Sequence, residues 1–176
     1  MENNFAGKCL CSLGKIEKSF STKLIDYFIQ RVRKNLLYYH FISFQNKSIP
    51  KNGQEFVQYW RRFLKSVGDQ YTYLLSVGGE NLSNIFKTEI SFGLLGDIVK
   101  ALEYHIVDSD VDAVVGILEG LGQTNRFSLS IQFLSSAEKD KMKTLFDKLN
   151  SMCGDSHSEM LPRLDSLCEI YELKKK

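Results

Sequence analysis

Proline is almost absent from this sequence, and its two copies stand far apart. Only Pro50 and Pro162 occur, so the 111 residues from 51 to 161 contain none. Proline breaks helices because it lacks a backbone N–H, whereas Leu, Lys and Glu, in which this stretch is rich, favour them. A hydrophobic fraction of 43% is enough for a real core. We therefore expect an all-α domain.

The helix with the clearest pattern spans Gln54–Ser66. Its apolar residues recur at i, i+4, i+7 and i+8, which is one face of an α-helix; they are Phe56, Trp60, Phe63 and Leu64. We expect this stripe to lie in the core. Arg61 and Arg62 lie off the stripe, in water or against a partner. The alternative for Trp60 is a partly exposed interface hot spot beside these two arginines.

Further apolar stripes follow, separated by glycines and by residues that cap helices. They occupy residues 73–75, 82–86, 94–106, 111–118, 127–134, 142–149 and 161–171. Short connections without a fixed period predict a compact bundle or short solenoid of about six to eight short helices, rather than a true repeat array.

The ends of these helices are predicted from local signals. We expect Gly68 to end the Trp60 helix, Gly78-Gly79 to end the next, and Asp69 and Ser91 to act as caps. Ser135 and Glu138 match a capping box. The segment Cys153–Ser158 is predicted to be a loop.

The N-terminal part differs from the rest. Residues 1–50 carry eight Lys and Arg against three acids, whereas residues 51–176 carry fifteen against eighteen. A basic segment suits an acidic surface such as tubulin, nucleic acid or lipid headgroups, or it is simply solvated. Met1–Phe20 shows no period and is expected to be poorly ordered. Ser21–Phe44 has a passable helical period, as a helix packed on the domain or as an interfacial or partner-binding helix.

The polar stretch Gln45–Gln54, which contains Pro50 and Gly53, is the best domain boundary. We therefore expect a basic N-terminal extension at residues 1–49, helical or disordered, and a helical domain at residues 50–173.

Several classes of protein are disfavoured. Met1–Phe20 lacks the continuous apolar core of a secretory signal, and no uncharged run approaches the roughly 18–20 residues that a membrane span needs. Cys9 and Cys11 have C-x-C spacing rather than the C-x-x-C that suits zinc or redox chemistry. All four cysteines are expected to be reduced thiols in the cytosol.

A calcium-binding loop is partly matched by Asp108-Ser109-Asp110-Val111-Asp112 with Glu119. The template requires glycine at its sixth position, where this chain has Ala113, and a helical apolar stripe runs through the part that would wrap the ion. We expect the aspartates to cap and favour a helix N-terminus, where the helix dipole is positive.

Other short motifs also lack the residues that their chemistry requires. Phe92-Gly93-Leu94-Leu95-Gly96 has no phosphate-binding lysine. Asp155-Ser156-His157-Ser158 contains triad residue types, but adjacent loop residues rarely give triad geometry. Gly116 and Gly120 have G-x-x-x-G spacing, which lets a neighbouring helix approach closely. We expect no catalytic residue, no cofactor and no metal ion.

Several segments, in this order, resemble the C-terminal domain of RNA polymerase II-associated protein 3, a helical domain that also occurs in ciliary dynein-arm assembly factors. They are FVQYWRRFL at Phe56–Leu64, YLLSVG at Tyr73–Gly78, LSNIFKTEISFGLLGDIVKAL at Leu82–Leu102 and VVGILEGLGQTNRFSLSIQFLSSAEKDKMKTLF at Val114–Phe146. The resemblance covers residues 50–173, and the Trp-Arg-Arg helix, Phe92–Gly96 and Leu167–Leu173 look closest to a ciliary member. That member has a coiled coil at its N-terminus, whereas residues 1–48 here show no heptads.

The resemblance implies a non-enzymatic scaffold for assembly and attachment of axonemal dynein arms in motile cilia and flagella, located in the cytoplasm and the axoneme. The partners that it implies are axonemal dynein, microtubules and a second copy of the chain, with no nucleic acid and no membrane span. The alternative is a co-chaperone adaptor that docks on RuvB-like AAA+ ATPases. A third interpretation is peripheral lipid binding through Ser21–Phe44.

The candidate protein-binding residues are Arg61, Arg62 and Arg126. They rest on their expected exposure alone. Arg126 follows a Gly-Gln-Thr-Asn turn, where its guanidinium either binds a partner carboxylate or caps the carbonyls of the preceding helix.

Overall fold

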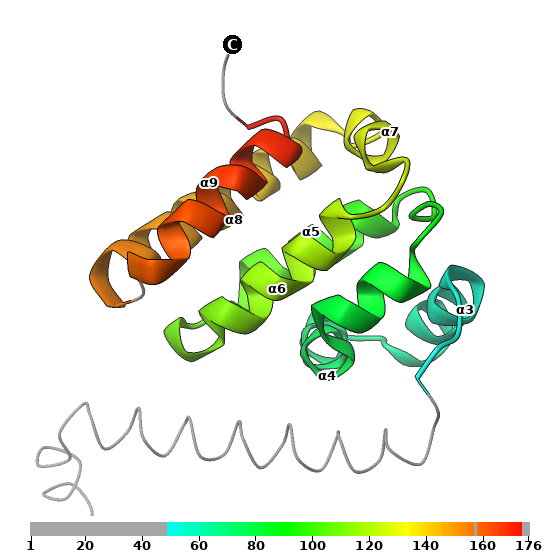
Figure 1. Cartoon of the computed structure of the whole chain (residues 1–176). Helices are drawn as coiled ribbons and strands as arrows, with labels where there is room; N and C mark the ends of the chain where they lie inside the picture. Colours follow the sequence, from blue (N-terminus) through cyan, green and yellow to red (C-terminus); the bar gives the residue numbers. More distant parts are fainter. Residues whose placement is uncertain (1–48, 157, 174–176) are drawn as a thin grey trace, which may run out of the picture. The chain divides into compact units, whose positions relative to one another are not determined.

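The computed structural model describes residues 49–156 and 158–173, which form seven α-helices and two 3-10 helices without a strand in this range (Figure 1). The α-helices are α3 (Gly53–Phe63), α4 (Val67–Ile85), α5 (Leu94–His105), α6 (Val111–Gly122), α7 (Phe127–Gln132), α8 (Ser136–Ser156) and α9 (Leu161–Ile170), with η1 at Asp108–Asp110 and η2 at Ser158–Met160. The predicted all-α fold and number of helices are confirmed.

The helices stack in successive layers. Helix α6 packs on α4 on one side and on α9 on the other, while α5 packs on α4 and α8 (Figure 1). Helices α8 and α9 close the far side of the stack. This order is what places the short helix α7 at the edge, between α6 and α8.

Helix α3 is held by the aromatic stripe that its sequence predicts. Phe56 and Trp60 are 0% and 2% exposed, and the Phe56 ring centroid lies 5.2 Å from that of Tyr73 and 5.0 Å from that of Phe86. Trp60 is therefore a core residue and not an exposed hot spot. The expectation for Phe63 was wrong, because it is 53% exposed. It ends the helix, and its ring faces Tyr59 instead of the core.

Helix α4 begins earlier than predicted. Gly68 does not end the preceding helix, because α3 stops at Phe63 and Ser66 caps α4. Ser66 Oγ accepts from the Asp69 N–H at 3.0 Å, and the Asp69 carboxylate accepts from the Ser66 N–H at 3.4 Å. Asp69 is thus the third-position partner of a capping box, not the cap itself.

The predicted break at Gly78-Gly79 is confirmed as a sharp kink. Gly78 has φ +74° and ψ 162°, a conformation that side chains with a Cβ rarely adopt, and the helix resumes beyond it. The kink bends α4 so that Gly79 presents its backbone to α6.

Three glycines form the crossing between α4 and α6. A Cβ added at Gly79 would overlap the carbonyl oxygen of Gly116, and a Cβ added at Gly120 would overlap the carbonyl oxygen of Gly79. The crossing is therefore backbone to backbone, with no room for a methyl group. The close approach predicted from the Gly116–Gly120 spacing is confirmed.

Helix α5 has no side-chain cap, contrary to the prediction for Ser91. Gly93, with φ +79°, occupies the N-cap, and only the carbonyl of Ser91 contributes, accepting from the Leu94 N–H at 3.0 Å. The helix is tied to α8 by Glu103, whose carboxylate accepts from Lys148 Nζ at 2.6 Å. This hydrogen bond holds the pKa of Glu103 below its usual range.

Helix α8 begins at the predicted capping box and runs further than predicted. Ser135 Oγ accepts from the Glu138 N–H at 3.3 Å, and Glu138 Oε2 accepts from the Ser135 N–H at 2.8 Å. The expected loop at Cys153–Ser158 was wrong, because the helix continues to Ser156 and Cys153 is fully buried. Its apolar thiol extends the buried face of the helix by one turn.

Helix α9 spans the predicted residues to within one position. Tyr171, which follows it, is fully buried and donates from its hydroxyl to the Leu118 carbonyl of α6 at 2.9 Å. Its ring packs on Phe127 and Phe146, with centroids 4.7 Å and 5.3 Å away. Tyr171 therefore joins α6, α7 and α8 at one point.

Some expectations fall outside the described residues. They concern Met1–Phe20, Ser21–Phe44, Cys9 and Cys11. Cys153 is a buried free thiol. The domain boundary at residues 49 and 50 stays a prediction. None of the described helices is long and apolar enough to cross a membrane.

The glycine crossing gives a matched test of packing. Gly79→Ala and Gly120→Ala should each lower the free energy of unfolding by about 3 kcal/mol, because the new methyl group meets backbone that cannot move without separating α4 and α6. Gly116→Ala is the control, since nothing lies within 4 Å of its added Cβ. It should stabilise the chain by roughly 0.5–1 kcal/mol through helix propensity. Urea unfolding measures all three, and equal effects would contradict the crossing.

Candidate functional site

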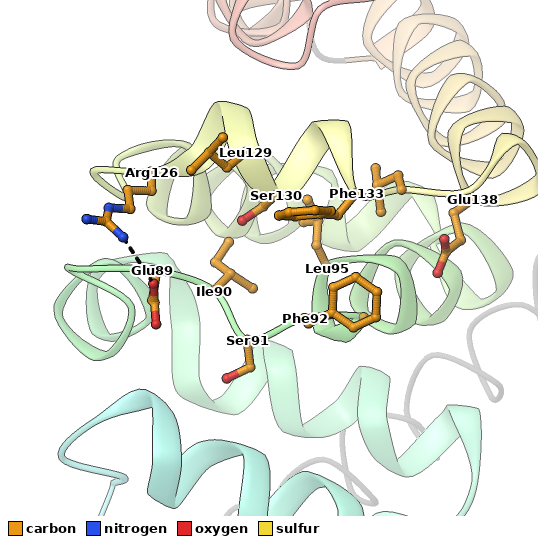
Figure 2. Close-up of a pocket in the computed structure, with 12 residues that line it drawn as sticks. Glu89, Ile90, Ser91, Phe92, Leu95, Arg126, Leu129, Ser130, Phe133 and Glu138 are labelled. Carbon is orange, nitrogen blue, oxygen red and sulfur yellow. Dashed lines mark ion pairs between the residues drawn. The ribbon is translucent and has the colours of Figure 1, made fainter.

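A hollow of about 320 Å³, which we call the aromatic groove, lies between the loop before α5 and the short helix α7 (Figure 2). The residues that line it are Glu89, Ile90, Ser91, Phe92, Gly93, Leu95, Arg126, Leu129, Ser130, Phe133, Leu134 and Glu138. Its floor is apolar and already buried. Its walls include large apolar side chains that remain in contact with water.

Helix α7 has two apolar faces, and only one of them is covered. Phe127 and Ile131 are 5% and 3% exposed and belong to the predicted core stripe. Leu129 and Phe133, four residues apart, lie on another face and are 44% and 65% exposed. That second face forms one wall of the aromatic groove.

Phe92 forms the opposite wall. It is 73% exposed, and its ring meets that of Phe133 edge to face, with centroids 5.6 Å apart (Figure 2). Gly93 follows it with a positive φ, and this turn directs the chain into α5. The two rings stabilise each other modestly but leave most of their surface in water, which is typical of a surface that binds another apolar surface.

The two ends of the aromatic groove differ in charge. At one end, Arg126 lies 3.8 Å from Glu89, and both side chains are about two-thirds exposed, at 66% and 64% (Figure 2). Such a pair contributes little to stability and is easily exchanged. The predicted exposure of Arg126 is found, and its guanidinium faces Glu89.

At the other end stands Glu138, which is half-buried. Its Oε2 accepts from both the N–H and the hydroxyl of Ser135, at 2.8 Å and 2.6 Å. The hydroxyl bond, followed by the backbone bond, holds the pKa of the Glu138 carboxyl below its usual range. Gly96 leaves the space that this carboxylate occupies, because an added Cβ there would overlap it. The aromatic groove therefore has a fixed negative charge at this end.

The residues of the partly matched calcium loop are held by an arginine. Arg163 on α9 donates through Nε and Nη2 to the two carboxylate oxygens of Glu119, at 2.8 Å and 2.6 Å, and through Nη1 to Asp112 at 2.9 Å. Asp110 accepts from the Tyr71 hydroxyl at 2.8 Å and makes no cap bond, so the predicted capping by this aspartate was wrong. Within residues 49–156 and 158–173, no three His, Cys, Asp or Glu side chains converge as metal ligands.

The other predicted binding residues lie elsewhere. Arg61 and Arg62 are exposed on α3, which is separated from α7 in Figure 1. Neither makes an ion pair within the described part of the chain, and the Arg62 guanidinium lies 6.0 Å from the Phe63 ring centroid. The structure does not bring them together with Arg126. The side chains of Asp155-Ser156-His157-Ser158 lie outside the described residues.

The sequence contained a signal for the aromatic groove that its core stripes obscured. Phe133 is out of phase with Phe127, Ile131 and Leu134, and Phe92 precedes the helix whose leucines are buried. Large aromatic residues out of register with a complete stripe point to a second surface. That Phe92 and Phe133 meet, forty-one positions apart, follows only from the packing of α5 against α8 and of α7 beside them.

Comparison with known proteins relates the domain to one family. The family described as the potential Monad-binding region of RPAP3 matches residues 49–139, just over half of the chain. The NMR structure of the C-terminal domain of the human RPAP3 protein superposes with a TM-score of 0.59, covering 70% of this chain and 89% of that chain at 23% identity. This likeness concerns the fold alone.

Curated relatives match more than half of this chain. A protein named dynein axonemal assembly factor 19 from Danio rerio is 42% identical over 61% of this chain, and its Mus musculus counterpart is 43% identical over 58%. RNA polymerase II-associated protein 3 of Xenopus laevis is 26% identical over 58% of this chain and 16% of its own length. The match spans 44% of the length of each of the two assembly factors.

The charge of Glu138 should be visible in the pH dependence of stability. The pKa of Glu138 is lower in the folded chain than its ordinary value of 4.5. The carboxylate therefore contributes to stability above pH 4.5, and this contribution is lost as the pH falls through the folded pKa. At pH 7 the free energy of unfolding of the wild type should exceed that of Glu138→Gln by about 0.5 kcal/mol. The difference is small because Gln still serves a capping box, and it should shrink below pH ~5. Urea unfolding across this range measures it. Ser135→Ala should reduce the acid-dependent part, and a pH-independent difference would contradict the assignment.

Proposed function

The chain belongs to the family of the RPAP3 C-terminal domain, and from this premise we propose that it is a non-enzymatic, protein-binding scaffold for the assembly and attachment of axonemal dynein arms in motile cilia and flagella. The observation that carries the proposal is the 42% identity to dynein axonemal assembly factor 19 of Danio rerio over 108 residues. The quoted segments also resemble coiled-coil domain-containing protein 103, a ciliary dynein-arm assembly factor. The site of action would be the cytoplasm and the axoneme.

The aromatic groove supports a binding role over a catalytic one. Its walls are Phe and Leu side chains, and its charged groups are held in a capping box or an exposed ion pair. Apolar side chains of this kind bind by removal of surface from water, at roughly 25 cal/mol per Å². The proposed partners are axonemal dynein and microtubules, together with a second copy of the chain.

A second candidate function is favoured by the family description. Because the matched family is the potential Monad-binding region of RPAP3, the domain is also proposed as a co-chaperone adaptor that docks on RuvB-like AAA+ ATPases. The two functions use the same fold. They differ in the proteins captured from a ciliated cell.

Capture from ciliated-cell extract tests the proposal and its site. The full chain should retain dynein chains and tubulin, detected by mass spectrometry, and Phe133→Asp should reduce their recovery at least about tenfold, because a carboxylate in an apolar contact is costly to desolvate. Phe133 is largely exposed, so the fold should survive. Tyr104→Asp is the matched control, since Tyr104 is 72% exposed and lies outside the aromatic groove. Recovery of RuvB-like ATPases without dynein or tubulin would favour the adaptor function.

The arginines of α3 are tested in the same assay. Arg61→Glu with Arg62→Glu should spare the fold, because both side chains are exposed, and should weaken capture several-fold if they face an acidic partner. The control reverses two other exposed charges, with Lys51→Glu and Lys100→Glu. Unchanged capture by the arginine variant would make Arg61 and Arg62 solvated surface.

A further inference from the structure

We propose that the occupant of the aromatic groove is an amphipathic helical segment of a protein partner, which places apolar side chains against Phe92, Leu129 and Phe133 and a lysine or arginine against Glu138. The inference rests on the proposed binding function and specifies the chemistry of the partner.

The apolar half of the inference follows from the exposure of the walls. Phe92, Leu129 and Phe133 are all at least 44% exposed, above a floor in which Ile90, Leu95 and Leu134 are at most 7% exposed. The walls come from a turn and a helix, and the described residues contain no strand edge to which an extended peptide could add. Phenylalanine also lacks the hydroxyl or indole N–H that aromatic grooves for proline-rich peptides donate. A helix with apolar residues on one face remains as the matching shape.

The charged half of the inference follows from the different charges at the two ends of the aromatic groove. Arg126 and Glu89 face each other at 3.8 Å, so their charges offset at that end (Figure 2). Glu138 is the unbalanced charge among the groove residues, and no described cation pairs with it. A partner cation therefore meets an anion there instead of competing with a resident salt bridge.

Glu138 is also held in position before any partner arrives. Its Oε2 is engaged by the Ser135 N–H and hydroxyl, whereas Oε1 lies beside Gly96 of α5 and accepts no hydrogen bond among the described residues. A carboxylate already fixed by its own helix cap loses little freedom when a lysine or arginine binds its second oxygen. This arrangement favours a specific contact over a diffuse attraction.

The test selects partners without assuming their sequence. A phage library of short random peptides is selected on the full chain, with Phe133→Asp used for counter-selection, and the affinities of enriched peptides are measured by fluorescence anisotropy. Enriched peptides should carry apolar residues at helical spacing and a Lys or Arg at a constant offset. Glu138→Gln, which preserves the capping box, should weaken them about tenfold, and replacing their basic residue by Gln should remove this sensitivity. Tyr104→Asp should bind them as wild type does.

Each contrary result has a defined meaning. Peptides that require Phe133 but bind Glu138→Gln equally would overturn the charged half, and a library without Phe133-dependent peptides would overturn the whole inference. A synthetic peptide of residues 21–44 that displaced the selected peptides would assign the aromatic groove to this chain's own N-terminal segment. Dimerisation in sedimentation that is lost in Phe133→Asp would assign it to a second copy. The scaffold function fails separately, through the extract capture, if neither dynein chains nor tubulin are retained.

Discussion

The backbone contact between α4 and α6 determines where the other helices lie. Gly79 and Gly116 touch through atoms that no side chain separates, and Gly120 approaches Gly79 from the next turn of α6. Residues that flank this contact, such as Val77 and Ile117, are almost completely buried. The kink at Gly78 directly precedes Gly79, the residue at which α4 meets the backbone of α6. Helices α5 and α9 then pack on the pair so formed.

The far layer depends on polar contacts that link distant parts of the chain. Arg163 joins α9 to two acids of α6, and Lys148 joins α8 to Glu103 of α5. These side chains are partly exposed, so each contact contributes modestly to stability. Their effect is mainly on register, because a slip of one helical turn would leave the carboxylates without partners. Tyr171 does the same within the core, where its hydroxyl reaches the backbone of α6.

The aromatic groove is a consequence of the small size of α7. This helix of six residues buries a single face in the core, and that face carries Phe127 and Ile131. Leu129 and Phe133 are left on the other face beside Phe92, and the capping box of the following helix places Glu138 next to them. The cap of α8 and the aromatic groove are therefore built from the same few turns.

Local sequence patterns were sufficient to predict the helical class, most helix positions, the Ser135–Glu138 cap, the core role of Trp60 and the close approach at the glycine spacing. These depend on local chemistry, namely proline content, apolar period and side-chain caps, all of which act within one or two turns. Four features came to light with the folded chain: Phe63 faces outward, α8 continues through Cys153, Arg163 holds Asp112 and Glu119, and Phe92 meets Phe133. Those outcomes depend on which distant surface arrives against a side chain, and a periodic stripe shows only that a face is apolar, not what covers it.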